Sequence, residues 1–167
     1  MDFNIERLLD LTGRKILKEL QENARSPFSE IGRRVGLTTP AVAERVRRME
    51  KVGLITGYKA EIDLPKLGFP LLVFIKLYTA PQWYDKVLAL IYASPEILEC
   101  HHMTGEESFI LKLTVTSTTH LETVIGRFSL YGKTSTSIVL SSPVKGRSVD
   151  LVAVNHNSGE NLSSSGD

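Results

Sequence analysis

The sequence predicts an α+β protein, in which an N-terminal (winged) helix-turn-helix domain precedes a ferredoxin-like βαββαβ domain. Up to residue 53, apolar residues recur at helical spacing in three short segments separated by glycine and proline. From residue 71 the period changes to two, and the segments follow the order β-α-β-β-α-β. We expect domains over 1–57 and 69–154, joined by a connecting strand and linker over 58–68, and a disordered tail over 155–167.

The composition is that of a globular protein. Of 167 residues, 42% are hydrophobic and 23% charged, which argues against a disordered or collagen-like chain. Cys100 is the single cysteine, so no disulfide can form within the chain, which suits a reducing cytosol. The longest apolar runs, 71–75 and 87–93, are far shorter than the roughly 20 residues that span a bilayer, and the first residues lack a secretory signal pattern. We expect a cytoplasmic protein with no membrane partner.

The first two predicted helices follow from apolar spacing and start signals. Ile16, Leu17 and Leu20 mark a helix that runs to about residue 23, with Thr12 as the expected N-cap. Ser26 followed by proline then predicts a second capped start, with the proline at the first helical position. Gly36 is a natural residue to end this second helix.

A third helix follows the glycine turn, at a second cap-plus-proline pattern. We favour Thr39 as its cap, because the next residue, a proline, then stands at the first helical position; Thr38 is the alternative. Val42, Val46 and Met49 form its inner stripe, and the helix ends near residue 53. The charged residues Glu44, Arg47, Arg48 and Lys51 therefore face outward, and Arg45 lies nearer the boundary of the buried face. Residues 54–62 follow as a wing or connecting strand.

The second half alternates strands and helices. Residues 71–78 form a strand that is apolar on both faces, so both faces should be covered, one of them by a partner subunit. A helix follows around 83–94, then strands over 96–104 and 108–116 joined by a tight turn. A second helix around 121–128 and a β-branched strand over 133–142 complete the order.

Positive charge is concentrated in the first half. Residues 1–60 hold 12 Lys and Arg against 8 Asp and Glu, a net of +4, whereas the remainder carries −3. All of the excess lies within 28–60. A basic segment beside an acidic one is typical of a polyanion-binding module joined to a part with another role.

The outward face of the third helix supplies candidate DNA contacts, since recognition helices place their N-terminal part in the major groove. We expect groove contacts from Thr39, Ala43, Glu44, Arg47 and Arg48, and phosphate contacts from Arg33, Arg34 and Lys51. Thr38 and Pro40, at the start of the helix, complete the expected DNA-binding set. The alternative for these arginines is surface ion pairing with nearby glutamates at i,i+3 or i,i+4.

The chain resembles the Lrp/AsnC family, the leucine-responsive or feast/famine transcription regulators, over residues 8–142. The matching stretches keep the family's order and spacing; they are 9–17, 30–37, 41–50, 53–58 and 95–105. The resemblance implies a helix-turn-helix that binds double-stranded DNA and a C-terminal ligand-sensing (RAM) domain. It also implies homodimers that assemble further, commonly into octamers, a nucleoid-associated location in the cytoplasm, and no cofactor beyond an amino-acid or small-metabolite effector.

The effector site is the part where the chain departs from the family pattern. We expect pocket walls from the turn and from the hydroxyl-rich strand, namely Thr104, Gly105, Glu106, Glu107, Ser108, Thr134, Ser135 and Thr136. The alternative is a plain hairpin turn and strand-forming threonines. Ser108 replaces a family Asp that could hold an ammonium group, and residues 130–133 lack the usual Pro-Gly-Val. Gly13 also replaces an Asp, which predicts a weaker start of the first helix.

Two other function classes are compatible with parts of the sequence. An architectural DNA binder would share the basic segment but protect many unrelated sites equally. A siroheme-decarboxylase-like enzyme shares the architecture and places histidines in the sensing domain, and it would purify with a red tetrapyrrole. His101, His102 and Cys100 lie close in sequence, but a metal site needs three or four ligands fixed in space, so we expect neither a metal nor catalysis here.

Overall fold

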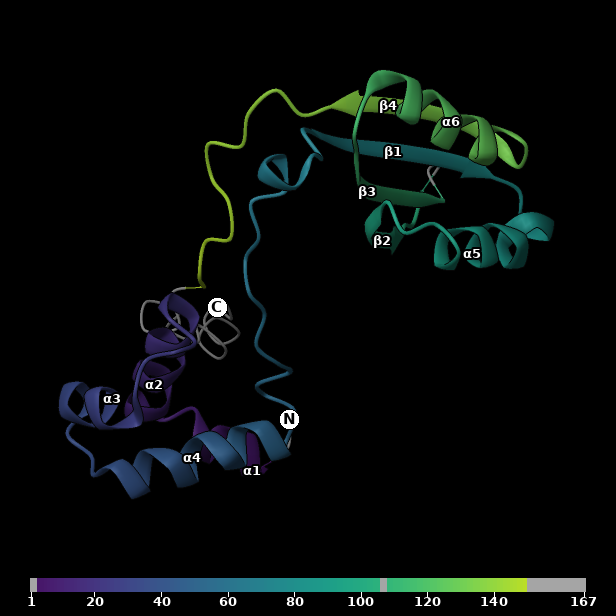
Figure 1. Ribbon diagram of the computed structural model, residues 1–167. Helices are drawn as coiled ribbons and strands as arrows, with labels where there is room; N and C mark the ends of the chain where they lie inside the picture. The colour runs from purple at the N-terminus through teal and green to yellow at the C-terminus, as the bar shows by residue number, and fades with distance from the viewer. Residues whose placement is uncertain (1–2, 106–107, 150–167) are drawn as a thin grey trace, which may run out of the picture. The chain divides into compact units, whose positions relative to one another are not determined.

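The computed structural model describes residues 3–105 and 108–149, so the expected tail over 155–167 and the end of the second predicted domain lie outside the described residues. The chain divides into two compact units (Figure 1). One unit contains the residues up to Ala60 together with the segment that begins at Val144, and the other runs from Glu61 to Pro143. The precise domain boundaries stay a prediction.

Helices build the first unit, and three of them match the predicted ones. The described helices are α1 (Phe3–Leu8), α2 (Leu11–Glu22), α3 (Phe28–Val35) and α4 (Thr39–Lys51). The short helix α1, of six residues, was not predicted, because so few residues show no clear periodicity. The pair α3 and α4 forms the helix-turn-helix, as predicted.

The N-cap of α2 is not the residue that the sequence suggested. Asp10 caps the helix, with its Oδ1 accepting a hydrogen bond from the amide of Gly13 at 2.7 Å. The choice of Thr12 is wrong by two residues, because Thr12 already lies in the first turn. An Asp side chain satisfies one of the free amides there and adds a favourable charge at the helix start.

The starts of α3 and α4 are also shifted. Thr38 caps α4, with its Oγ1 accepting from the amide of Ala41 at 3.4 Å, so the alternative cap is correct and the favoured Thr39 is helical. For α3 the cap position is Pro27, which has an extended ψ of 138° and no side-chain cap, rather than Ser26. Such shifts of one residue change the local hydrogen bonds but leave the apolar stripes where they were predicted.

The core of the helical unit lies where these stripes meet. Ile16 of α2 and Ile31 of α3 are fully buried, and Val42, Val46 and Met49 of α4 are buried as predicted. With its inner stripe packed against α2 and α3, α4 presents its other side to solvent. Residues 54–64 form no strand, so the expected wing or connecting strand is not seen; the described residues of this unit include no neighbouring strand that could complete a ladder.

A four-stranded antiparallel sheet forms the second unit, in the order β2-β3-β1-β4. The strands are β1 (Leu71–Thr79), β2 (Ile97–His102), β3 (Phe109–Val115) and β4 (Gly132–Ile138), and the main helices are α5 (Tyr84–Tyr92) and α6 (Thr118–Ser129). Two short 3-10 turns, η1 (Pro65–Leu67) and η2 (Pro81–Trp83), precede β1 and α5. This is the βαββαβ arrangement that the sequence predicts.

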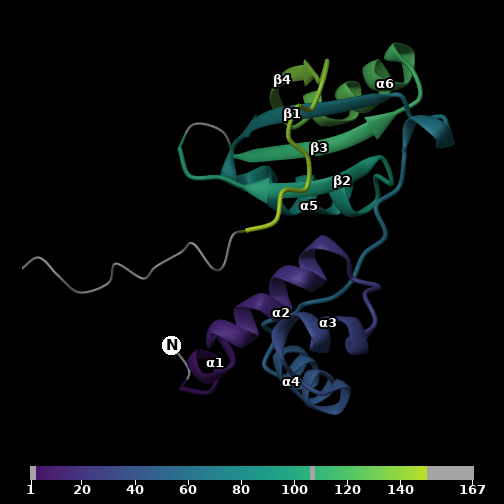
Figure 2. The same ribbon diagram turned by 90° about the vertical axis from the view of Figure 1, so that its left-hand side faces the viewer.

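Both helices cover the same face of the sheet (Figure 2). Ile75 of β1 lies opposite Leu111 of β3, and both are fully buried beneath Val87 of α5 and Val124 of α6. The other face of β1 is only partly covered by the described chain: Phe74 on it is 36% exposed, and Leu72 and Tyr78 are half-buried. The prediction that both faces of β1 are covered is therefore met on one side only within a single chain.

None of the helices in the described part of the chain combines the length and apolarity that a bilayer-spanning segment needs.

Candidate DNA-binding surface and sensing domain

A left-handed glycine turns the chain from α3 to α4. Gly36 has φ 74° and ψ 34°, a conformation that costs glycine least, and its amide donates to the carbonyl of Gly32. The amide of Leu37 donates to the same carbonyl at 2.9 Å, which closes the end of α3. The turn therefore sets the direction of α4, as predicted for Gly36.

The exposed side of α4 carries the two arginines expected in the groove. The side chains of Arg47 and Arg48 are 73% and 65% exposed, and Glu44 accepts one hydrogen bond from each at 2.9 Å. These bonds, led by that from Arg48, lower the pKa of Glu44. The ion pairs expected as the alternative are present, but both guanidinium groups remain at the surface, where a partner can reach them.

The phosphate-contact candidates differ in their surroundings. Arg34 bonds to Glu19 of α2 and, at 2.6 Å, to Glu30 of its own helix, so it holds α3 against α2. Arg33 is exposed and makes no ion pair with another described residue, and Lys51 is likewise exposed at the end of α4. Arg33 and Lys51 are thus free to meet a polyanion, whereas Arg34 would have to exchange partners.

One ion pair that orients α4 was not predicted. Arg45 donates to both carboxylate oxygens of Asp10, at 2.9 and 2.8 Å, while Asp10 also caps α2. Hydrogen bonding from Arg45 lowers the pKa of this carboxyl. The sequence places Arg45 at the boundary of the helix face but contains no signal for its partner, because 35 residues separate the two.

Gly13 stands where the family usually has an Asp, and the fold leaves no room for a side chain there. A Cβ atom would lie 1.8 Å from the carbonyl oxygen of Leu8. The expected weakening of the helix start is offset, since Asp10 supplies the charge and the hydrogen bond at this end of α2.

In the sensing domain, Ser108 has a structural role that the sequence did not reveal. It is only 7% exposed; its hydroxyl donates to the carbonyl of Thr79 at 2.9 Å and accepts from the Thr79 amide at 3.2 Å. The hydroxyl of Thr79 in turn donates to the carbonyl of Tyr131 at 2.6 Å. These bonds join the ends of three segments, and they occupy the group that the effector hypothesis assigned to a ligand.

The other effector candidates are spread over the sheet. Thr134 and Thr136 lie opposite Leu77 and Ile75, on the face that the helices cover, whereas Ser135 lies on the open face opposite Lys76. Thr104 and Gly105 are exposed in the turn after β2, and Glu106 and Glu107 lie outside the described residues. The described candidates therefore do not line one wall.

Cys100 and His102 share the helix-covered face of β2, opposite Leu111 and Phe109. The ring of His102 stacks on Phe109 at 4.9 Å and meets the edge of Tyr84 at 5.2 Å. Burial raises the pKa of the Cys100 thiol. Throughout residues 3–105 and 108–149, no three His, Cys, Asp or Glu are grouped in a way that could hold a metal ion.

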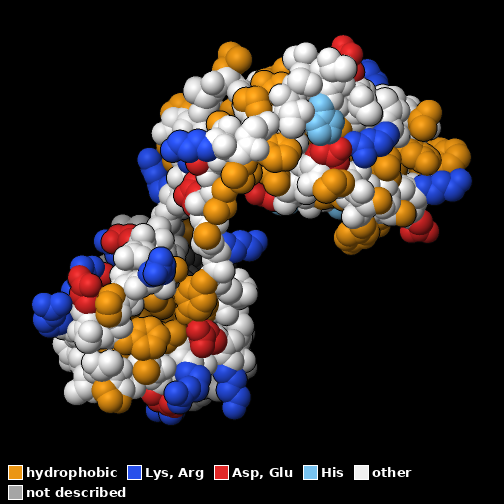
Figure 3. All heavy atoms as spheres, viewed as in Figure 1, with side chains coloured by type: hydrophobic (Ala, Val, Ile, Leu, Met, Phe, Trp, Pro, Cys, Tyr) orange, Lys and Arg blue, Asp and Glu red, His pale blue; other side chains and the backbone are white. Residues whose placement is uncertain are grey.

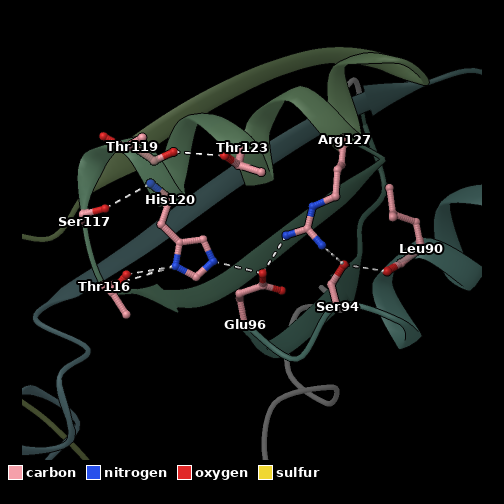
Figure 4. A network of polar contacts seen from close by, with 9 residues as sticks. All are labelled: Leu90, Ser94, Glu96, Thr116, Ser117, Thr119, His120, Thr123 and Arg127. Atoms are coloured by element: carbon pink, nitrogen blue, oxygen red, sulfur yellow. Dashed lines mark hydrogen bonds and ion pairs between the residues drawn. The ribbon is translucent and has the colours of Figure 1, made fainter.

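A polar network that the sequence did not indicate ties α6 to the start of β2 (Figure 4). Glu96 Oε1 accepts from Arg127 at 2.7 Å and lies 3.1 Å from Nε2 of His120. Burial raises the pKa of Glu96, but the bonds from the backbone, His120 and Arg127 outweigh it and hold the pKa below its ordinary value. Arg127 also reaches Ser94 at 3.4 Å, so the network fixes the helix position.

Comparisons with known proteins cover both units. Residues 9–50 match the AsnC-type helix-turn-helix domain, and residues 72–149 match the Lrp/AsnC ligand binding domain. The uncharacterized regulator YezC of Bacillus subtilis is 38% identical over 80% of this chain and 95% of its own length. The regulator LrpC of the same organism is 32% identical over 80% of this chain and 92% of its own.

Solved structures agree with this assignment. The structure of B. subtilis LrpC has a TM-score of 0.75 and 31% identity, covering 80% of this chain and 95% of that one. A feast or famine regulatory protein from M. tuberculosis, complexed with L-methionine, has a TM-score of 0.78 and 31% identity over 84% and 98% of the two chains. Sequence motifs, fold and relatives agree: the chain belongs to the Lrp/AsnC family of transcription regulators.

Proposed function

We propose that this regulator binds specific operators by placing the N-terminal part of α4 in the major groove of double-stranded DNA. The observation that carries the proposal is the pair Arg47 and Arg48, which project from a helix whose opposite stripe is buried. Arginine suits the O6 and N7 atoms of guanine. Thr39, Ala43 and Glu44 lie closer to the N-terminal end of the same helix, and Arg33, Arg34 and Lys51 supply phosphate contacts.

A gel shift on the DNA that flanks the protein's own gene, with and without a mixture of amino acids, tests this function. We expect a shift at one or a few fragments that survives competition by unrelated DNA, and a change in affinity with the mixture. A footprint that protects many unrelated sites equally would instead assign an architectural role. No shift at low ionic strength would reject DNA binding. The regulators among its relatives support a non-enzymatic role, and we infer from such a role a location at the nucleoid, in the cytoplasm.

The open face of the sheet supports homodimerisation. Leu72, Phe74 and Tyr78 of β1 and Ile110 of β3 share this face; Phe74 is 36% exposed there, and the other three are half-buried. A second copy of the chain would bury these side chains against an identical face. Dimers then place two α4 helices on near-palindromic half-sites about one helical turn apart, and further assembly, commonly to octamers in the family, builds on the dimer.

Sensing of an amino acid is the second half of the proposal. Relatives crystallised with L-methionine support this ligand class. An effector acts by preferring one assembly or DNA-binding form over another. Because the hydroxyl of Ser108 is already hydrogen-bonded to Thr79, the exposed turn at Thr104 and Gly105 is the remaining candidate wall of the effector pocket. Titration calorimetry against a panel of amino acids, with no heat from any of them, would contradict the proposal.

A further inference from the structure

A carboxylate stands at the centre of the exposed side of α4. At about 100° per residue, Glu44 faces away from the buried Val42 and Val46. Arg47 and Arg48 follow one turn later, about 60° to one side of Glu44 and about 40° to the other. Basic and acidic side chains lie side by side over α4, along the lower edge of the helical unit (Figure 3). A helix that enters a groove by this side therefore brings a negative charge with it.

Glu44 holds both arginines, and it uses a different oxygen atom for each. Its Oε2 accepts from Nη1 of Arg47 at 2.9 Å, and its Oε1 accepts from Nε of Arg48, also at 2.9 Å. The side chain of Glu44 is itself 47% exposed, so all three groups lie where DNA can reach them. The bonds from Arg48 and then Arg47 lower the pKa of Glu44, which therefore stays ionised near neutral pH. Any contact of these arginines with DNA must compete with the carboxylate.

The second carboxylate of α4 has a different role. Glu50 lies near the end of the helix and accepts from the hydroxyl of Tyr58 at 2.8 Å, which ties the following segment to α4. The bonds of Glu44 with Arg47 and Arg48 are i,i+3 and i,i+4 pairs, which stabilise an exposed helix only slightly. Phosphates repel a carboxylate on the side of the helix that approaches DNA. Helix stability alone is therefore a weak reason for an acidic residue at this position.

The edges of the bases offer this carboxylate one suitable partner. The N4 amino group of cytosine is a donor in the major groove and suits Glu, whereas O6 and N7 of guanine are acceptors, which suit Arg. Glu44 lies one helical turn from the two arginines, and a turn of about 5.4 Å is shorter than two base-pair steps of about 3.4 Å each. The base pairs that supply the cytosine and the guanine should therefore lie no more than two positions apart.

We propose that Glu44 determines the sequence specificity of α4, by accepting a hydrogen bond from a cytosine and by withholding the arginines from other sequences. On the matching sequence the arginines leave Glu44 for guanine, and the carboxylate gains the cytosine amino group in exchange. On other DNA, Glu44 either keeps the arginines or stands unpaired beside acceptors and phosphates, which is unfavourable. This inference rests on the proposed function, because it requires α4 to enter the major groove.

Selection from a pool of random-sequence duplexes tests the role of Glu44 in the full-length protein. The wild type should enrich sequences with two G·C pairs no more than two positions apart. Glu44→Ala should bind the unselected pool about tenfold more tightly and lose the preference at one of these two pairs. Glu44→Gln should enrich an A·T pair at that position instead, since Gln suits N6 and N7 of adenine. An unchanged sequence preference in both variants would overturn the proposal.

Glu30→Ala is the matched control, because it removes the same charge and also takes an i,i+4 partner from an arginine, Arg34. Glu30 lies on α3, outside the helix proposed to read bases, so this variant should strengthen binding to all duplexes alike and leave the enriched sequences unchanged. If Glu44→Ala behaves in the same way, Glu44 acts only through its charge and the proposal is wrong. If the wild type enriches no sequence or binds no duplex, the proposed function itself fails.

Discussion

Asp10 and Arg45 join the start of α2 to the middle of α4 through two hydrogen bonds of 2.9 and 2.8 Å. Asp10 caps its own helix with the same carboxylate. One side chain therefore sets both the beginning of a helix and the position of the proposed recognition helix. Since α4 carries Arg47 and Arg48, the pair determines how these side chains are presented to DNA.

Removing the Asp10 carboxylate should destabilise the helical unit. Asp10→Ala loses the cap and the ion pair, and we expect the free energy of unfolding to fall by about 1–2 kcal/mol, most of it from the cap, since solvent screens the half-exposed pair. Asp10→Asn keeps a capping oxygen and should cost about half as much. Urea unfolding of both Asp10 variants, of Arg45→Ala and of the variant that combines Asp10→Ala with Arg45→Ala measures the coupling free energy between the two side chains. Strictly additive losses would mean that the ion pair contributes nothing to stability.

The same pair predicts a pH dependence in acid. The hydrogen bonds from Arg45 lower the pKa of Asp10 in the fold, so the folded chain binds this proton less readily than the unfolded chain. The stabilisation is fully present above about pH 5 and is lost as pH falls below about 4, through the folded pKa. The stability difference between wild type and Asp10→Asn should shrink over that range. A difference that stays constant down to pH 2 would contradict this.

Arg47 and Arg33 should affect DNA binding in different ways. Arg47→Ala should cost about 1–3 kcal/mol of operator binding and relax selectivity at one base pair, if Arg47 reads a guanine. Arg33→Ala is the matched control for a phosphate contact: it should weaken all sequences alike and reduce the salt slope by about 1. Affinities for operator and mutated operator at several salt concentrations distinguish the two, and unchanged selectivity in Arg47→Ala removes it from the reading set.

Ser108 should prove to be a structural residue. Ser108→Ala leaves the amide and carbonyl of Thr79 without the hydroxyl, at a cost of about 1–3 kcal/mol in the stability of the sheet unit. Ser108→Asp restores the family residue, yet an ionised carboxylate cannot donate to the Thr79 carbonyl, so it should also destabilise. Thermal unfolding of the two variants measures both losses of stability. A fully stable Ser108→Asp protein that gains amino-acid binding would show that the serine bonds are dispensable.

The open sheet face predicts an effect on assembly. Phe74→Lys places a charge in the centre of the face proposed for the partner, and we expect a shift toward monomers at micromolar concentration with the fold unchanged. Leu130→Lys, at an exposed position after α6, serves as the control. Sedimentation of the two variants measures their molecular masses in solution. Equal masses for Phe74→Lys and Leu130→Lys would show that the dimer contact lies elsewhere.

Local patterns in the chain account for much of the fold. The stripe of Val42, Val46 and Met49 was predicted because burial follows the period of the helix itself, and the strands of the second half were predicted from their period of two. Gly36 was predicted because few other residues adopt its left-handed conformation. The charged side of α4 follows from the same geometry, and so the DNA-binding candidates could be named without coordinates.

Local patterns of this kind do not predict contacts between residues that are distant in the sequence. Asp10, and not Thr12, caps α2, and the ion-pair partner of Asp10, Arg45, lies 35 residues away in the sequence. Ser108 was assigned to a ligand, yet it bonds to Thr79 on the neighbouring strand, 29 residues earlier. Periodicity reveals which side of an element is buried, since that depends on neighbours along the chain. Which polar groups pair across elements depends on how those elements pack, and only folding brings these atoms within hydrogen-bond distance.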